Sequence, residues 1–426
     1  MQVIQNLKVK ETLYLENLEN GLTVMIIPKK NVQKKYIIWG TNYGSNDSTF
    51  IVPGETEITE VPKGVAHFLE HKMFEQENGK NSLDVLTDLG VNANAYTTND
   101  HTAYLYECTD NFYEALDEFM DYVQHPYFTD ENVEKEKGII GQEIMMYDDY
   151  PEWKVYLNTL EAMYHSNPVK LDITGTIDTI KEINKEILYK CYNTFYQPSN
   201  MAMVVCGDFE PEKLLEEIKK RLIKTDKKGE IKRIYPEEPE NIVKEKVIQK
   251  MDVSRPLFNI GIKVNNFSSI SSKEKVRKSI MIQLILNLLF GESSNLYKKL
   301  YNNGNISYIP VMDFEYSKTY SHILISGQSN NPEELYEELK KEIKNMKNQN
   351  IKPEDFERLK KTLYGEYIKE YNDVTDTARM FLVDYFKDVN TFEFVEQVSN
   401  INLKEIYQIL DDYFDESKMV LSIVQA

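Results

Sequence analysis

The chain is poor in cysteine, and this scarcity excludes two common kinds of site. Its 426 residues contain three cysteines, Cys108, Cys191 and Cys206, whose wide spacing fits neither a disulfide framework nor a CxxC metal site. Buried, unpaired thiols in a reducing compartment are the simplest interpretation, and they predict a cytoplasmic protein. The first residues contain no apolar run followed by a small-residue cleavage site, so we expect no secretory signal.

Positive charge and long apolar runs are scarce as well. The chain has 50 Lys and Arg against 69 Asp and Glu, a net charge of −19. This balance argues against a nucleic-acid partner, because phosphate contact requires a basic face. The most apolar stretch, Ser279 to Phe290, includes Gln283 and Asn287 and is too short for a membrane span. A composition of 41% hydrophobic and 28% charged residues excludes a disordered chain, and the length suggests two or three domains.

Short patterns predict alternating strands and helices in the first half. Asn20-Gly21 between two apolar runs predicts a hairpin over residues 13–27. Strands are expected at 36–44 and 201–205, and a strand pair at 92–106, which is rich in Thr, Tyr and Ala. Apolar periodicity predicts helices at 65–74, 111–123 and 130–147, the last with Thr129 or Asp130 as N-cap.

The two halves of the chain resemble each other weakly. Residues 195–201 resemble 413–419 at an offset of 413 − 195 = 218, and residues 129–144 resemble 352–367 at an offset of 352 − 129 = 223. Two ordered matches at similar offsets indicate two copies of one α+β domain. Charged, proline-containing sequence near the middle predicts a solvated linker. The predicted division is therefore a domain at 1–225, a linker at 226–248 and a second domain at 249–426.

The sharpest chemical signal is the run His67-Phe68-Leu69-Glu70-His71. On a helix, His67 and His71 lie one turn apart on the same face, where two imidazoles can hold one metal ion. Glu70 lies near that face and can reach a metal-bound water, as in the inverted HxxEH motif of metallopeptidases. The alternative is a helix that carries two histidines by chance.

A catalytic zinc site usually needs a third protein ligand. Glu136 and Glu143 are seven residues apart on one acidic helix, which places them on the same face. One of them can bind zinc while the other hydrogen-bonds a ligating histidine; an ordinary solvated helix face is the alternative. In the second half, Leu359 corresponds to Glu136 and no HxxEH occurs, so that half is predicted to lack a metal site.

These motifs, taken together, resemble the pitrilysin, insulinase and mitochondrial processing peptidase family of zinc peptidases. The segments that match in order are VPKGVAHFLEHKMF, GVNANAYTTNDHTAY, EKGIIGQEI, DITGT and YQPSNMAMVVCGDF. The likeness covers essentially the whole chain and is closest to small bacterial members. It implies an α+β fold of two tandem homologous domains, each a mostly antiparallel sheet packed with helices.

The resemblance also implies a role for each matched residue. It implies Zn²⁺ as cofactor with His67, His71 and Glu143 as ligands, Glu70 as general base, and Glu136 as hydrogen-bond partner of a ligand. The segment 92–98 matches the strand on which a substrate peptide is added as a further strand, with Asn94 and Ala95 as backbone partners.

One part of the family pattern is missing. Many active members carry an Arg and a Tyr seven residues apart in the second domain; here Tyr308 fits the Tyr, but Tyr301 stands in place of the Arg. A core tyrosine is the alternative for Tyr308. Some bacterial members are heterodimers in which a zinc-free subunit supplies this pair, so the resemblance predicts a heterodimer, or else a homodimer.

Three functions follow from these patterns. The first is a zinc metalloendopeptidase that hydrolyses short or unfolded peptides with a zinc-activated water. The second is a non-catalytic peptide-binding or scaffold subunit of a peptidase-like complex, favoured by the missing Arg. The third is a zinc-binding protein with unrelated chemistry.

Overall fold

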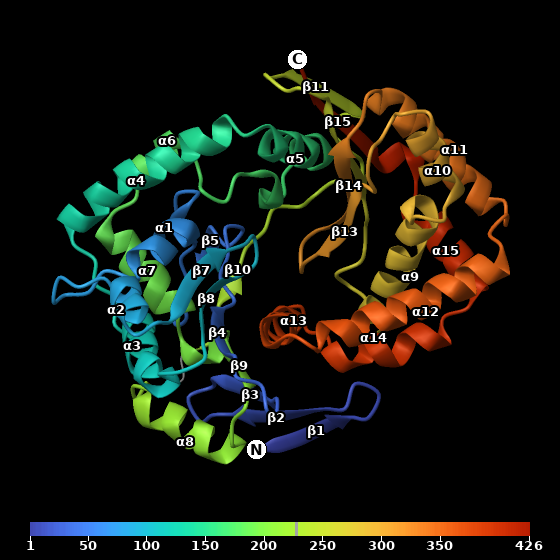
Figure 1. Cartoon of the computed structure of the whole chain (residues 1–426). Coiled ribbons are helices and arrows are strands. Elements are labelled where there is room, and N and C mark those ends of the chain that lie inside the picture. Colours follow the sequence, from blue (N-terminus) through green and yellow to red (C-terminus); the bar gives the residue numbers. More distant parts are fainter. Residues whose placement is uncertain (226–228) are drawn as a thin grey trace. The chain divides into compact units, whose positions relative to one another are not determined.

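The computed structural model describes residues 1–225 and 229–426, and they form two compact units (Figure 1). Unit 1 comprises Met1–Ile144, Asp172–Ile234 and Lys369–Thr391, and unit 2 comprises Met145–Leu171, Tyr235–Ile368 and Phe392–Ala426. Each unit has a mostly antiparallel sheet with helices packed on it. The predicted α+β class is therefore confirmed.

Unit 1 is built on a seven-stranded sheet. Its strands in spatial order are β1 (Gln2–Asn6), β2 (Glu11–Asn17), β3 (Thr23–Pro28), β9 (Met201–Gly207), β4 (Lys35–Thr41), β8 (Thr102–Cys108) and β7 (Asn92–Thr97). The predicted hairpin is β2–β3, and the predicted pair at 92–106 is β7–β8. All seven residues of β9 are buried, as expected for a central strand read from a continuous apolar run. A smaller sheet joins β5 (Thr49–Ile51) to β6 (Thr59–Glu60) and β10 (Lys232–Arg233).

The helices of unit 1 cover this sheet with their apolar faces. Val133, Ile140 and Ile144 of α4, for example, are buried in the unit 1 core. The helices are α1 (Val65–Lys72), α2 (Ser82–Asp88), α3 (Phe112–Gln124), most of α4 (Asp130–Asp148), α6 (Ile177–Lys181), α7 (Lys185–Phe195), α8 (Pro211–Arg221) and α13 (Val374–Phe386). Thr129 caps α4, because its hydroxyl accepts a hydrogen bond from Asn132 N at 3.1 Å.

Unit 2 contains a five-stranded sheet with its own helices. The strands in order are β11 (Lys246–Lys250), β15 (Met419–Gln425), β12 (Leu257–Lys263), β14 (Ser321–Gln328) and β13 (Val311–Tyr316). The helices are α5 (Pro151–Met163), α9 (Ser272–Phe290), α10 (Asn295–Asn302), α11 (Pro332–Lys347), most of α12 (Pro353–Glu370) and of α14 (Thr391–Gln397), and α15 (Leu403–Tyr413).

The two sheets share one topology. The order β11-β15-β12-β14-β13 repeats β3-β9-β4-β8-β7, and in both the first pair is parallel and the next three are antiparallel. Strands β9 and β15 begin at Met201 and Met419, which are 218 residues apart. The internal repeat read from the sequence is thus a repeat of a supersecondary unit.

Each sheet is covered by a helix from the other half of the sequence. Helix α13 packs on β4 and β9 of unit 1, whereas α5 packs on β12 and β15 of unit 2. Each contact is permitted by a glycine of the sheet. A Cβ on Gly40 would lie 2.8 Å from Phe386 of α13, and a Cβ on Gly261 would lie 2.2 Å from Met163 of α5. The compact units therefore differ from the predicted contiguous division at 1–225 and 249–426, since each includes a segment from the other half.

The segment predicted as a solvated linker is partly built into unit 2. Residues 226–228 lie outside the described residues, but β11 begins at Lys246 and pairs with β15. Glu238 accepts hydrogen bonds from the backbone N–H groups of His165, Ser166 and Asn167 at 2.7–2.9 Å. Its partner Lys263 is only 2% exposed. Composition did not predict this buried ion pair, because buried and exposed ion pairs are made of the same residue types.

A buried carboxyl on α13 makes the stability of unit 1 depend on pH. Asp384 is 8% exposed, and its Oδ2 atom has no hydrogen-bond partner among the described residues. Burial raises the pKa of Asp384 to about 7, against an opposing hydrogen bond with Thr391. The folded state therefore holds a proton that the unfolded chain releases near pH 4, so this group lowers stability as the pH rises from about 4 through 7.

We expect Asp384→Asn to remove about 2.5 kcal/mol of this pH dependence between about pH 5 and pH 8, because an amide has no proton to lose. Urea unfolding at both pH values would measure it, with Trp39 of unit 1 as the fluorescent reporter in a Trp153→Phe background. The pH 5 comparison corrects for the cost of burying the amide itself. If wild type and variant show the same change in stability with pH, the inference that folded Asp384 holds a proton up to about pH 7 is wrong.

Candidate metal centre

Helix α1 brings both histidines of the HxxEH motif to one side. The imidazole ring centroids of His67 and His71 are 4.5 Å apart, as expected for residues one helical turn apart. His67 and Glu70 are buried, whereas His71 is partly exposed. The motif therefore lies at the boundary between the unit 1 core and solvent.

Helix α4 supplies two carboxylates to the same place. Glu143 Oε1 lies 3.7 Å from His67 Nε2, and Glu143 Oε2 lies 3.7 Å from His71 Nε2. Glu136, two turns earlier, is buried, and its Oε1 lies 3.1 Å from His71 Nδ1. The two glutamates thus lie on opposite sides of His71, one at each ring nitrogen.

The donor atoms of His67, His71 and Glu143 fit a zinc ion. All lie within 4.8 Å of one another, and they form the one such group in the part of the chain that the structure describes. Tetrahedral bonds of about 2.0–2.1 Å separate neighbouring donors by about 3.3 Å, close to the observed 3.7 Å. Glu136 on the far nitrogen of His71 matches the usual carboxylate–histidine support. His67 Nδ1, by contrast, is buried without a hydrogen-bond partner among the described residues.

The electrostatics of the group favour a cation. Burial lowers the pKa of His67 to about 3, with a smaller effect of neighbouring His71, so His67 is neutral at physiological pH. Burial opposes charge on His71, but the hydrogen bond with Glu136 and nearby carboxylates outweigh it and raise the pKa of His71. Burial raises the pKa of Glu143. A divalent ion would relieve the crowding of these carboxylates.

Glu70 has a hydrogen-bond donor that the sequence analysis missed. Thr97, at the end of β7, donates its hydroxyl to Glu70 Oε2 at 2.8 Å. Burial raises the pKa of Glu70, and the charge of His71 and this hydrogen bond act against it. The raised pKa suits a group that accepts and then returns a proton. No local signal could have identified Thr97, because it is 27 residues from Glu70 in the sequence.

A buried lysine was also missed. Lys72 is 0% exposed, and its Nζ lies 2.7 Å from Glu75 Oε2 and 3.5 Å from Glu136 Oε2. The signal in the sequence was a lysine in the middle of the apolar-periodic run HFLEHKMF, where a core position would be expected.

The predicted peptide-binding positions lie on an open sheet edge. Strand β7 is the last strand of its sheet and pairs only with β8 among the described strands. The N–H of Ala95 donates to the side chain of Asn94 at 2.9 Å, so this N–H points away from β8. Thr97 of the same strand contacts Glu70, so the edge runs beside the predicted metal ligands of α1. The substrate role of Asn94 and Ala95 stays a prediction.

Tyr308 belongs to unit 2 and is 44% exposed, so it is not a core tyrosine. Tyr301, which stands in place of the expected Arg, is 52% exposed and packs against Tyr297 at 5.8 Å between ring centroids. An arginine does contact the loop before Tyr308: Arg255 bonds to Ser307 and donates to Asn305 O at 2.8 Å. A substrate role for Tyr308 stays a prediction.

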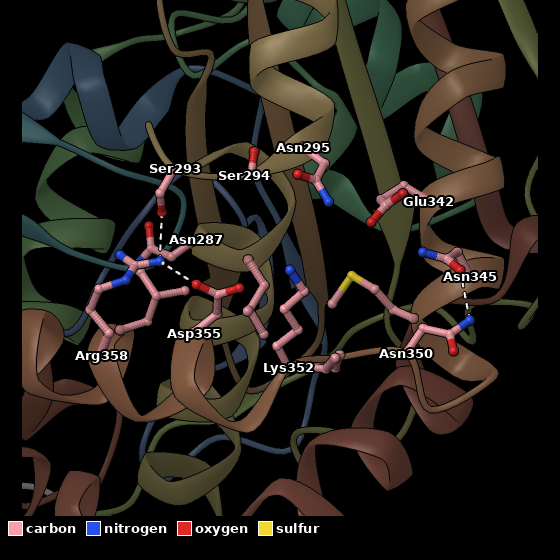
Figure 2. Close-up of a pocket in the computed structure, with 14 residues that line it drawn as sticks. Asn287, Ser293, Ser294, Asn295, Glu342, Asn345, Asn350, Lys352, Asp355 and Arg358 are labelled. Atoms are coloured by element: carbon pink, nitrogen blue, oxygen red, sulfur yellow. Dashed lines mark hydrogen bonds and ion pairs between the residues drawn. The ribbon is translucent and has the colours of Figure 1, made fainter.

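Unit 2 also contains a polar pocket between the ends of its helices (Figure 2). Its volume is about 80 Å³, and its lining includes Asn287, Ser293, Lys352, Asp355 and Arg358. The guanidinium of Arg358 donates to Ser293 at 2.6 Å and to Asp355 at 3.1 Å, so these polar groups satisfy one another (Figure 2). The pocket is too small for a peptide.

Known proteins resemble this chain over nearly its whole length. Residues 50–177 match the family described as insulinase (peptidase family M16), and residues 182–363 match the peptidase M16 inactive domain. The uncharacterized zinc protease YmfH of Bacillus subtilis (strain 168) is 38% identical over 95% of this chain and 94% of its own. The chain belongs to peptidase family M16.

Solved structures support the M16 assignment. The crystal structure of an M16-like peptidase from Alicyclobacillus acidocaldarius has a TM-score of 0.92 and 30% identity, over 98% of this chain and 99% of that one. A protease from Helicobacter pylori has the same fold, with a TM-score of 0.81 and 20% identity over 97% and 99% of the two chains. The M16 match to the HxxEH half, together with zinc-protease relatives, supports a metallopeptidase. Among the described helices, none is long and apolar enough to cross a bilayer.

Proposed function

We propose that this M16 chain is a zinc metalloendopeptidase that hydrolyses short or unfolded peptides. The observation that carries the proposal is the convergence of His67, His71 and Glu143 from two helices, with Glu70 beside them. Its three free thiols are all buried, in agreement with the predicted cytoplasmic location. The cytoplasmic location of the protein stays a prediction.

The chain's own residues would divide the work of hydrolysis. Zinc, when bound, would lower the pKa of a coordinated water and polarise the scissile carbonyl. Glu70 accepts the proton of the attacking water and returns it to the leaving amine, and Thr97 holds the Glu70 carboxylate for this transfer. Glu136 fixes the ring of His71 through Nδ1. The open edge of β7 pairs with an extended peptide as an added strand.

The active assembly we propose is a dimer, with a homologous zinc-free partner that supplies the missing Arg. Tyr308 is exposed and available for substrate, but Tyr301 cannot provide a cationic clamp. A homodimer is the second possibility. A non-catalytic peptide-binding subunit is the alternative function, and the absent Arg is the observation that favours it.

Metal content and peptide cleavage test the proposal together. We expect about one zinc per wild-type chain and none bound by His67→Ala. Cleavage of a quenched peptide would be assayed for the chain alone and mixed with a homologous partner. Cleavage that requires zinc supports the peptidase. Zinc binding without cleavage in either form favours the scaffold subunit, and no zinc above the His67→Ala level contradicts the metal centre.

We expect Thr97→Val to lower kcat by about tenfold and to leave zinc affinity unchanged. Valine keeps the shape of threonine but cannot donate to Glu70 Oε2, and one hydrogen bond to a charged group contributes about 1.5–3 kcal/mol. Thr87→Val is the matched control, because Thr87 is exposed on α2 and its hydroxyl donates to Leu83 O within the same helix. A variant with wild-type kcat would show that Thr97 does not orient the base.

A further inference from the structure

Lys72 lies in the core of unit 1, directly after a predicted zinc ligand. Its side chain has no exposed surface, although a lysine is almost never fully buried without charged partners. Two carboxylates supply that partnership, Glu75 at 2.7 Å and Glu136 at 3.5 Å. The bond to Glu136 links α1 to α4, the two helices that carry the predicted ligands.

Glu136 divides its two oxygens between different partners. Oε1 lies 3.1 Å from His71 Nδ1, and Oε2 lies 3.5 Å from Lys72 Nζ. The Glu136 carboxylate and the Lys72 ammonium are both buried, so water cannot take the place of either partner if the other is removed. The orientation of Glu136, and through it the ring of His71, therefore depends on Lys72.

The contacts continue outward as a chain of alternating charge. Glu75 Oε2 contacts Lys72, while Glu75 Oε1 lies 3.6 Å from Lys135 Nζ, whose side chain is 69% exposed. The contacts follow the order Lys135, Glu75, Lys72, Glu136 and His71. Each of these charged groups is thus adjacent to opposite charge, and the buried pair of Lys72 and Glu136 leads to His71, which is partly exposed.

We propose that Lys72 is a positioning residue for the metal centre. Lys72 holds the Glu136 carboxylate in place, and Glu136 in turn orients the ring of His71. The inference rests on the proposed function, since it takes His71 as a zinc ligand. Groups that orient a ligating histidine change metal affinity by about 10–100-fold when removed. Lys72 acts one contact further out, and we expect an effect at the lower end, about tenfold.

The test is the zinc affinity of Lys72→Met, measured by competition with a chromophoric chelator at fixed pH. Methionine keeps an unbranched side chain one heavy atom shorter than that of lysine and carries no charge, so we expect about tenfold weaker binding. Lys135→Met removes the exposed end of the charge chain and should bind zinc like wild type. A folded Lys72→Met with wild-type affinity overturns the proposal. If Lys72→Met does not fold, Lys72→Gln replaces it, and unchanged affinity in that variant has the same meaning.

A double-mutant cycle shows whether Lys72 acts through Glu136. In a Glu136→Gln background, Lys72→Met should have little further effect on zinc affinity, because the carboxylate it orients is gone. An equal loss in both backgrounds overturns the proposed route. These experiments also distinguish a wrong role for Lys72 from a wrong metal centre, because in the second case the wild-type chain would bind no more zinc than His67→Ala.

Discussion

Glu70→Gln is expected to lower kcat by about 10³-fold while the bound zinc stays at the wild-type level. A positioned general base contributes about 10²–10⁴-fold, and a glutamine amide cannot accept the proton of the attacking water. The substitution is nearly isosteric, and the Gln Oε1 atom can still accept the Thr97 hydroxyl that bonds Glu70 at 2.8 Å. The loss would therefore measure proton transfer more than packing.

The measurement is peptide cleavage by whichever assembly is active with the wild-type chain, together with zinc content. Glu77→Gln is the matched control, because Glu77 is exposed on the loop after α1. Retention of activity within tenfold of wild type would remove Glu70 from the role of base. Loss of zinc together with activity would show instead that Glu70 shapes the metal centre.

Lys263→Met is expected to destabilise unit 2 by about 3–5 kcal/mol, the usual cost of leaving a buried charge unpaired. Lys263 Nζ lies 2.5 Å from Glu238 Oε1 and donates to three carbonyls, those of Met163, Pro239 and Asn241, at 2.7–3.2 Å. Removal of the ammonium would leave the Glu238 carboxylate without its counter-charge, with only backbone N–H donors remaining, and would leave these carbonyls without the Lys263 donor. The segments around residues 163–167 and 238–241 would lose the group that joins them to β12.

Urea unfolding followed by Trp153, which lies in unit 2, would measure this change in a Trp39→Phe background. Lys341→Met serves as control, because Lys341 is 70% exposed and its ion pair with Glu338 is of the surface type. That control should change stability by about 0.5 kcal/mol or less. A Lys263→Met protein as stable as the control would show that the buried cluster contributes nothing to unit 2.

Local spacing in the sequence predicted the elements that carry the site. A separation of four residues in a helix places His67 and His71 on one face, and the structure has their rings 4.5 Å apart. The same reasoning put Glu136 and Glu143 on one face of α4, and the structure brings both to His71. Spacing alone left open which glutamate faces the metal, and the resemblance to a family made that choice. The catalytic and ligand roles stay predictions.

Contacts between distant segments were beyond that reasoning. Thr97 reaches Glu70 because β7 runs beside α1, and Lys72 finds Glu136 because α4 packs against it 64 residues later. Gly40 and Gly261 each allow a helix from the opposite half of the chain to cover a sheet, because a Cβ at either position would collide with a side chain of that helix. Glu238 belonged to a run of charge that composition assigns to solvent.

The sequence by itself determined the HxxEH helix and the internal repeat, because short spacings and ordered matches can be read along the chain, and the family resemblance it carries implied the α+β fold. Only the tertiary structure decided which helix covers which sheet, which charges are buried, and which side chains orient Glu70 and His71. Burial and partnership arise when segments far apart in the chain pack together, and no local pattern of residue types specifies that packing.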